Sequence, residues 1–250
     1  MTKSGGGKPA PGGSRARGSG ATASGVGRKA AIRTAGAYAA QAKTFVRHWG
    51  RRSDRQPRLL RDSLRICRRD AVVLDLGSGA GQDIRSLRRK RYRVVGLDLT
   101  WPLLAYARRR SRRVRLVQGD MRSLPFRNGV FDGVWAAASL IHLPKPAVRT
   151  TLRDLHGLVP PGGVLAATFV QGRNSGFLRT GWIPGRFFSR WRKAELEGAV
   201  RQAGWAIISL KTVANRERKG RWLNLLARRP ARSPAAGAPQ GPLPLRRPLC

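Results

Sequence analysis

The chain has 250 residues, enough for one α/β domain with a buried core. It carries 51 lysines and arginines against 12 acids, a formal charge of +39 that favours attraction to polyanions such as nucleic acid or an anionic membrane surface. Two cysteines exclude a disulfide framework and a zinc site, and no apolar run is long enough to span a membrane, so we expect a cytoplasmic protein without a metal.

The positive charge has two interpretations. Arginines dominate it and are scattered over the whole chain, and enrichment in arginine, alanine, glycine and proline is also what GC-rich codons produce. The alternative is a surface selected to bind RNA. Non-specific contact with nucleic acid through basic tails is compatible with either interpretation.

The two ends of the chain differ from its middle. Residues 1–30 contain no acid, and their only larger apolar side chains are those of Met1 and Val26. This composition predicts a disordered basic tail. A mitochondrial-type transit peptide is the alternative, although the many glycines disfavour an amphipathic helix. Residues 229–250 are rich in proline, arginine and alanine and predict a second tail. The folded domain is therefore expected over residues 31–228, as a monomer or homodimer.

Between the tails, helical and strand patterns alternate, which predicts an α/β fold with a doubly wound, mostly parallel sheet. Thr100 is suited to cap the helix that follows it. In chain order we expect a helix over Ala31–Trp49, a helix over Leu59–Arg68, a strand over Val72–Leu76, a helix over Gln82–Arg89, a strand over Val94–Asp98, a helix over Pro102–Arg110, strands over Val114–Gln118 and Phe131–Ala137, a helix over Ala147–Leu158, a strand over Val164–Val170, a helix over Arg192–Ala203, and strands over Trp205–Leu210 and Trp222–Ala227.

The first predicted strand ends in a turn with glycines at positions 77, 79 and 81, preceded by Asp75. Glycines let a backbone approach a ligand closely, so this turn is typical of a nucleoside site. Asp98 ends the second strand, where its carboxylate can accept hydrogen bonds from both ribose hydroxyls. Asp120 ends the third strand, and it could accept from an adenine amine while Met121 offers an apolar face to the ring. Taken alone, Asp120 is equally well explained as a turn residue.

The spacing of the turn narrows the choice of nucleotide. A dinucleotide-binding fingerprint would place a glycine at position 82, where Gln82 stands instead. The chain also lacks the phosphate-binding loop with a lysine after its last glycine. Both departures favour a nucleoside without a pyrophosphate.

Five segments in order resemble motifs of class I S-adenosylmethionine-dependent methyltransferases. A bacterial small-molecule branch of this family is resembled by three more segments: Tyr38-Ala39-Ala40-Gln41-Ala42-Lys43-Thr44-Phe45, Arg186-Phe187-Phe188 and Trp222-Leu223-Asn224. The resemblance extends over about residues 31–228. It is carried by Leu74-Asp75-Leu76-Gly77-Ser78-Gly79-Ala80-Gly81, Val95-Gly96-Leu97-Asp98-Leu99, Gly119-Asp120-Met121-Arg122-Ser123-Leu124-Pro125-Phe126, Phe131-Asp132-Gly133-Val134-Trp135 with the following Ser139-Leu140-Ile141-His142-Leu143-Pro144, and Leu158-Val159-Pro160-Pro161-Gly162-Gly163.

The resemblance implies a Rossmann-like sheet of seven strands whose last strand runs antiparallel, with S-adenosylmethionine as cofactor. The glycine turn with Ser78 would hold the methionine part, supported by Asp75. Asp98 would hold the ribose, Leu99 would pack on the adenine, and Asp120 with Met121 would bind it. Ala137 would line the methyl-transfer face, and Tyr38 would close over the cofactor.

His142 is the histidine nearest the expected reaction face, and it is the candidate general base. The alternative is a structural histidine bonded to backbone, the role we also expect for His48 and His156. Trp182 and Trp191 flank residues 171–191, where we expect loops that line the acceptor site. A small-molecule methyl acceptor is the leading hypothesis; an RNA methyltransferase, or an RNA-associated cofactor-binding protein, is the alternative.

Overall fold

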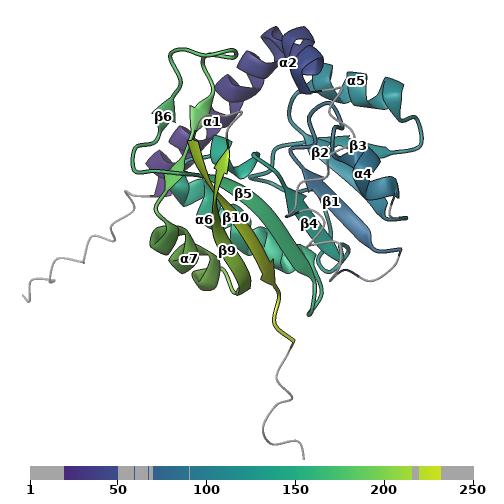
Figure 1. Ribbon diagram of the computed structural model, residues 1–250, viewed down its shortest axis with the longest axis vertical. Helices are drawn as coiled ribbons and strands as arrows, with labels where there is room; N and C mark the ends of the chain where they lie inside the picture. The colour runs from purple at the N-terminus through teal and green to yellow at the C-terminus, as the bar shows by residue number, and fades with distance from the viewer. Residues whose placement is uncertain are drawn as a thin grey trace, which may run out of the picture.

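The computed structural model describes residues 20–49, 59, 67, 70–89, 91–215 and 220–231. Its helices and strands alternate along the middle of the chain (Figure 1). In chain order they are α1 (Gly20–Ala40), α2 (Ala42–Trp49), β1 (Val72–Leu76), α4 (Ile84–Arg89), β2 (Arg93–Asp98), α5 (Trp101–Arg110), β3 (Arg115–Gln118), β4 (Gly133–Ala136), η1 (Leu140–His142), α6 (Lys145–Leu158), β5 (Val164–Gln171), β6 (Gly176–Phe177), β7 (Phe187–Phe188), β8 (Arg190–Trp191), α7 (Lys193–Gln202), β9 (Ala206–Asn215) and β10 (Gly220–Arg228).

The main sheet has the strand order β3-β2-β1-β4-β5-β10-β9, and the short β8 pairs with β5 beside this path. β1 runs parallel to both β2 and β4, whereas β10 runs antiparallel to both β5 and β9. The predicted doubly wound sheet with an antiparallel last strand is confirmed. Because the strand order reverses at β1, a crevice opens at the carboxyl ends of β1 and β4, where ligands of such sheets bind.

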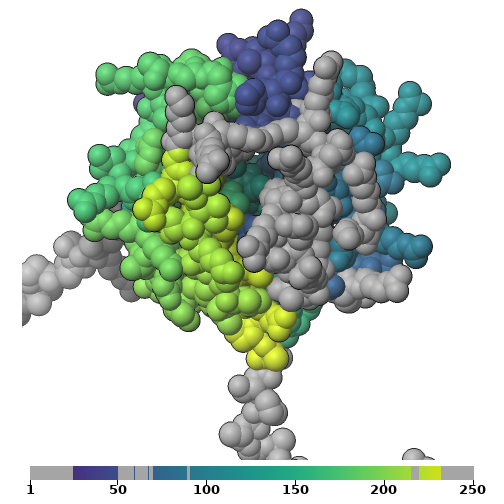
Figure 2. Space-filling view, in the orientation of Figure 1, coloured from purple at the N-terminus to yellow at the C-terminus, as the bar shows by residue number. Residues whose placement is uncertain are grey.

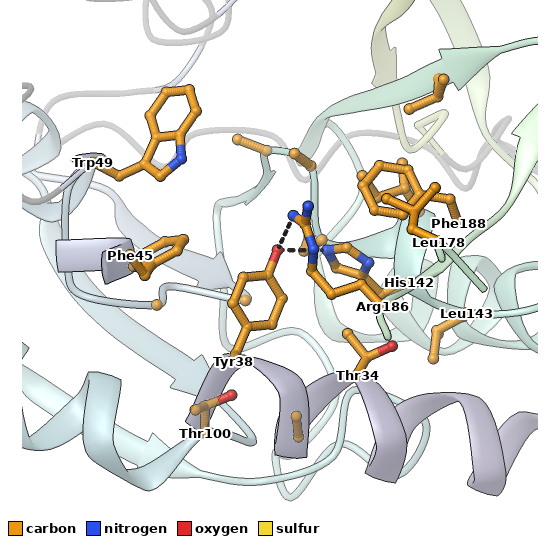
Figure 3. A pocket seen from close by; sticks show the side chains of 18 of the residues that line it. Thr34, Tyr38, Phe45, Trp49, Thr100, His142, Leu143, Leu178, Arg186 and Phe188 are labelled. Carbon is orange, nitrogen blue, oxygen red and sulfur yellow. Dashed lines mark hydrogen bonds between the residues drawn. The ribbon is translucent and has the colours of Figure 1, made fainter. Parts of the chain in front are cut away.

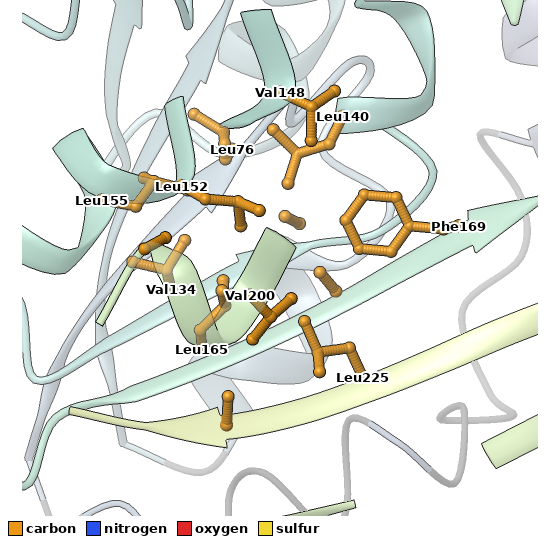
Figure 4. Close-up of a cluster of buried hydrophobic side chains, with 14 of the residues drawn as sticks. Leu76, Val134, Leu140, Val148, Leu152, Leu155, Leu165, Phe169, Val200 and Leu225 are labelled. Atoms are coloured by element: carbon orange, nitrogen blue, oxygen red, sulfur yellow. The ribbon is translucent and has the colours of Figure 1, made fainter. Parts of the chain in front are cut away.

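Each face of the sheet is covered by helices, which explains the apolar runs in its strands. Along β1, Val73 joins a cluster with Ile84 and Leu87 of α4. Leu74 and Leu76 point to the other face, where α6 and α7 pack. Figure 4 shows this second cluster, which includes the following labelled side chains: Leu76, Val134, Leu140, Val148, Leu152, Leu155, Leu165, Phe169, Val200 and Leu225. The buried sheet thus holds the strand ends in fixed positions.

The N-terminal helix begins earlier than the sequence predicts. The helix expected over residues 31–49 is two helices, and α1 already begins at Gly20, inside the expected tail. Ala30 is buried, and a Cβ placed on Gly27 would lie 3.6 Å from that of Ala147 on α6. Small side chains therefore let α1 approach α6 closely, so this segment buries surface although it lacks large apolar residues. The remaining parts of both predicted tails, and most of the helix predicted over residues 59–68, lie outside the described residues.

Two further expectations need correction. Thr100 occupies the N-cap position of α5, but its side chain makes no capping hydrogen bond; its backbone N–H donates to Asp98 Oδ1 instead. Residues 171–191 are not only loops, since they form the short strands β6, β7 and β8. No helix among the described residues combines the length and apolar character that crossing a membrane requires.

Candidate active site

A cavity of about 800 Å³ lies at the carboxyl ends of the strands. The turn after β1, the residues after β2, β3 and β4, the helices α1 and α2, and the segment after β5 all contribute to its wall. The space-filling view shows a hollow on this face between the N-terminal helices and the C-terminal strands (Figure 2). Nine of the twelve predicted site residues line it: Tyr38, Gly77, Gly79, Asp98, Leu99, Asp120, Met121, Ala137 and His142. Asp75, Ser78 and Gly81 do not.

The glycine turn adopts backbone conformations that other residues strongly disfavour. Gly77, Gly79 and Gly81 have φ angles of 73°, 52° and 74°. A Cβ on Gly77 would lie only 2.4 Å from the Cβ of Ser139, which follows β4. The backbone N–H groups of Gly77 and Ser78 both donate to the carbonyl oxygen of Leu97, at 2.7 and 3.0 Å. The turn is therefore held against β2 and against the loop after β4, and its backbone forms part of the cavity wall.

Asp98 is fixed at the end of β2 by hydrogen bonds to backbone. Its Oδ2 accepts from the N–H of Gly79 and its Oδ1 from the N–H of Thr100, both at 2.8 Å. Burial raises the pKa of Asp98, and these hydrogen bonds oppose that shift because they favour the charged carboxylate. A preorganised carboxylate thus borders the cavity.

Asp120 has a local partner that the sequence pattern did not reveal. Its carboxylate forms an ion pair with Arg122, in which Nη2 lies 2.6 Å from Oδ2, and it also accepts from the backbone N–H of Arg122. This geometry matches the turn interpretation of Asp120, although the residue also borders the cavity beside Met121. Its role toward an adenine ring stays a prediction.

Asp75 lies behind the glycine turn rather than in the cavity. It is 3% exposed, and its Oδ2 has no hydrogen-bond partner among the described residues. Burial, followed by the charges of Asp83 and Asp98, raises its pKa well above the usual range for an aspartate. Ser78 is likewise buried, and its hydroxyl oxygen also has no partner in the described part of the chain. Neither residue borders the cavity, and the supporting role of Asp75 for the turn stays a prediction.

A chain of hydrogen bonds crosses the cavity wall opposite the glycine turn. The carbonyl oxygen of Phe187 can only accept, so His142 Nδ1, at 2.7 Å, carries the proton and donates to it. In the neutral ring His142 Nε2 then accepts from the hydroxyl of Tyr38, at 2.9 Å. Arg186 Nη1 donates to the same hydroxyl at 3.2 Å. Figure 3 shows both hydrogen bonds of the Tyr38 hydroxyl as dashed lines. His142 thus combines a backbone hydrogen bond, as in the structural alternative, with a basic nitrogen held by Tyr38.

Besides Tyr38, several aromatic residues complete the cavity wall. Of these, the sequence analysis proposed only Trp182 as a ligand contact. Phe45 of α2 packs beside the glycine turn and stacks on Trp182, with ring centroids 6.0 Å apart. His48 also lies against Trp182 and lines the cavity, while its expected structural role stays a prediction. His156 packs under Trp205, away from the cavity. The aromatic spacing of Phe45, His48 and Trp49 at helical intervals was the available signal.

The other predicted acceptor contact, Trp191, is fully buried and does not line the cavity. It packs against Phe169 in the core, with ring centroids 6.1 Å apart, which explains its position. Beyond β4 the backbone is strained, because Ala138 has a φ angle of 54° and borders the cavity. This strained loop is secured by a hydrogen bond from the N–H of Ala138 to Thr168 Oγ1, at 2.8 Å.

Three residues that line the cavity carry a buried side-chain oxygen without a hydrogen-bond partner among the described residues. These atoms are Gln82 Oε1, Ser139 Oγ and Gln171 Oε1. Buried polar atoms normally find partners, so these positions favour a polar ligand. Together with the close-approach turn and Asp98, they fit a nucleoside that carries a polar amino-acid tail. The fold and the site define an α/β domain with a nucleoside site at the carboxyl ends of its strands.

Part of the chain is similar to known methyltransferases. Residues 73–163 match the family model for a methyltransferase domain. The chain is 34% identical over 115 residues to malonyl-[acyl-carrier protein] O-methyltransferase of Enterobacter lignolyticus, covering 46% of this chain and 45% of that protein. An uncharacterized methyltransferase of Mycobacterium tuberculosis is 36% identical over 116 residues, covering 44% of this chain and 58% of that protein. The chain thus spans about half the length of the curated relatives it matches.

A solved structure shares the fold over most of the chain. It is the 1,6-didemethyltoxoflavin-N1-methyltransferase of Burkholderia thailandensis, with bound 1,6-didemethyltoxoflavin and S-adenosylhomocysteine. The TM-score is 0.63 at 21% identity, covering 82% of this chain and 91% of that one. The chain therefore shares the fold of this methyltransferase.

Proposed function

We propose that the protein transfers a methyl group from S-adenosylmethionine to a small-molecule acceptor. The observation that carries this proposal is the joint placement of the glycine turn and Asp98 at one end of a single cavity, with Tyr38 and His142 at another part of its wall. A volume of about 800 Å³ lies in the range of small-molecule sites. The aromatic and backbone walls around it favour an enclosed acceptor over an extended one.

In this proposal the residues divide into two groups. The turn at Gly77 and Gly79 and the carboxylate of Asp98 hold the nucleoside, with Leu99 and Met121 along the ring, while Asp75 supports the turn from behind. The unpartnered oxygens of Gln82 and Ser139 are suited to accept hydrogen bonds from the ammonium group of the methionine part. When bound, the cofactor supplies a methyl group on a positively charged sulfur, ready for in-line displacement.

The chain's own contribution to the chemistry is alignment, exclusion of water and, where needed, a base. Well-oriented proximity supplies about 7–11 kcal/mol of the barrier reduction. Helices α1 and α2 cover the cavity and bring Tyr38 and Phe45 over it. If the acceptor arrives protonated, His142 Nε2 is suited to take the proton, directly or through the hydroxyl of Tyr38 that donates to it.

Calorimetric titration with S-adenosylhomocysteine tests the proposal. Asp98→Asn is expected to weaken binding about ten- to a hundredfold, because charge-assisted hydrogen bonds to the ribose contribute about 1.5–3 kcal/mol. Asp154→Asn is the matched control, since Asp154 is exposed on α6 and lies outside the cavity. Wild-type protein that does not bind, or an Asp98 variant that binds unchanged, would contradict the proposal.

A second candidate function rests on the formal charge of +39. Such a charge favours RNA as the methyl acceptor, or a role as an RNA-associated protein that binds the cofactor. This candidate requires RNA to reach the cavity or to couple to it, whereas non-specific attraction to phosphates requires neither.

A further inference from the structure

Arg186 is a buried cation in the cavity wall. Its side chain belongs to a residue only 6% exposed, and it borders the cavity. Nε donates to the carbonyl oxygen of Ile183 at 2.8 Å, and Nη1 donates to the hydroxyl of Tyr38 at 3.2 Å. A guanidinium has five N–H donors, so three are left over. In the part of the chain that the structure describes, no carboxylate forms an ion pair with Arg186.

Aromatic rings surround this guanidinium. Its Cζ lies 5.4 Å from the ring centroid of Tyr38, 5.1 Å from that of Trp182 and 5.2 Å from that of Phe188. The rings offset part of the desolvation of the charge through cation–π attraction, but they accept no N–H hydrogen bonds in the plane of the guanidinium. A buried charge without an anionic partner is costly, and proteins rarely keep one without a use.

The other charged groups at the cavity do not compensate Arg186. Arg190 and Arg221 also line it, and neither forms an ion pair with a described acid. The acids on the wall are Asp98, whose two oxygens accept backbone N–H groups, and Asp120, which is paired with Arg122. Among the described residues, the acceptor side of the cavity is therefore positively charged.

We propose that the methyl acceptor carries a carboxylate that binds the free edge of the Arg186 guanidinium. The planar fork of donors matches the two oxygens of a carboxylate. The rings of Tyr38, Trp182 and Phe188 shield this pair from water and favour an organic acid with an apolar body. This inference rests on the proposed methyltransferase function and names the class of its acceptor.

Binding of small acids to the protein loaded with S-adenosylhomocysteine tests the inference. The probes are benzoate and hexanoate, their uncharged amides benzamide and hexanamide, and inorganic phosphate, each titrated by calorimetry and by ligand-observed NMR. We expect the acids to bind at least about tenfold more tightly than their amides, because one charge-assisted pair contributes that much. Arg186→Gln should abolish the preference, and Arg186→Lys, which keeps the charge but loses the fork, should retain only part of it.

The controls separate the possible failures. Arg173→Gln is matched, since Arg173 is exposed in the same segment and lies outside the cavity, and it should leave the preference intact. The Arg186 variants should bind S-adenosylhomocysteine like wild type; if they weaken it instead, Arg186 serves the cofactor, directly or through Tyr38, and the inference is overturned. Equal binding of acids and amides, or a preference for phosphate over benzoate, also overturns it. If wild type does not bind S-adenosylhomocysteine at all, the proposed function itself fails.

Discussion

At the scale of single residues, Asp75 shows how the site is held at a cost to stability. A carboxylate that is 3% exposed and lies near Asp83 and Asp98 is difficult to ionise, so its pKa rises well above the usual range. The folded protein then binds this proton more tightly than the unfolded chain. The resulting stabilisation is fully present below a pH of about 4, the unfolded pKa, and it is lost as pH rises toward the raised pKa.

Asp75→Asn is therefore expected to be more stable than wild type at pH 7, because the amide has no charge to desolvate. The advantage should shrink as pH falls toward about 4, since wild-type Asp75 then folds with its proton in place. Chemical denaturation of both proteins at several pH values measures the difference in unfolding free energy. Each unit by which folding raises the pKa of Asp75 corresponds to about 1.4 kcal/mol in the free energy of unfolding. A difference that does not change with pH would contradict the assignment.

At the scale of elements, α2 and the segment after β5 meet above the glycine turn. Phe45 of α2 lies beside Gly79 and stacks on Trp182 with an interplanar angle of 19°. Trp182 is 39% exposed and borders the cavity, so the environment of its indole should change when a ligand binds there. These two elements are far apart in sequence, and their contact closes the cavity on one side.

Addition of S-adenosylhomocysteine is accordingly expected to change the tryptophan fluorescence of the protein. Trp182→Phe should remove a large part of this change, because a ring remains to stack on Phe45 but the reporter is gone. Trp101→Phe is the matched control, since Trp101 is 61% exposed and does not line the cavity. A fluorescence change that Trp182→Phe leaves intact would show that the two elements do not close over the ligand.

At the scale of the whole molecule, the formal charge of +39 sets how the protein meets polyanions. Attraction to phosphates releases counterions, so the affinity for RNA depends steeply on salt and little on sequence. The cations of the cavity wall, by contrast, act over short distances, and salt screens their interactions much less. The two effects are therefore separable in one experiment.

We expect the full chain to bind a labelled single-stranded RNA with an affinity that falls at least about tenfold between about 50 and 200 mM salt. The affinity for S-adenosylhomocysteine should stay nearly constant over the same range, and saturating RNA should not displace it. Fluorescence anisotropy and calorimetry give the two affinities. Transfer of a labelled methyl group from S-adenosylmethionine to the RNA would favour the RNA methyltransferase candidate over a small-molecule acceptor.

The sheet and the nucleoside half of the site could be predicted from the amino-acid sequence, because both depend on local patterns. Apolar runs mark the strands, and the glycines at 77, 79 and 81 mark a turn that only glycine adopts without strain. Asp98 is the last residue of β2, so its place at the carboxyl edge of the sheet is a consequence of chain order. The sequence pattern did not predict the ion pair between Asp120 and Arg122, although the two residues are only two positions apart.

The acceptor half became visible only in the folded molecule, because its residues come from segments with no common pattern. Arg186 lies in a segment that resembles the family, but its place in the cavity wall appears only when Tyr38 and Trp182 surround it. The start of α1 at Gly20 likewise depends on α6, which buries side chains too small to predict a core. Contacts between distant segments are set by packing and charge in three dimensions, and no local spacing in the chain encodes them.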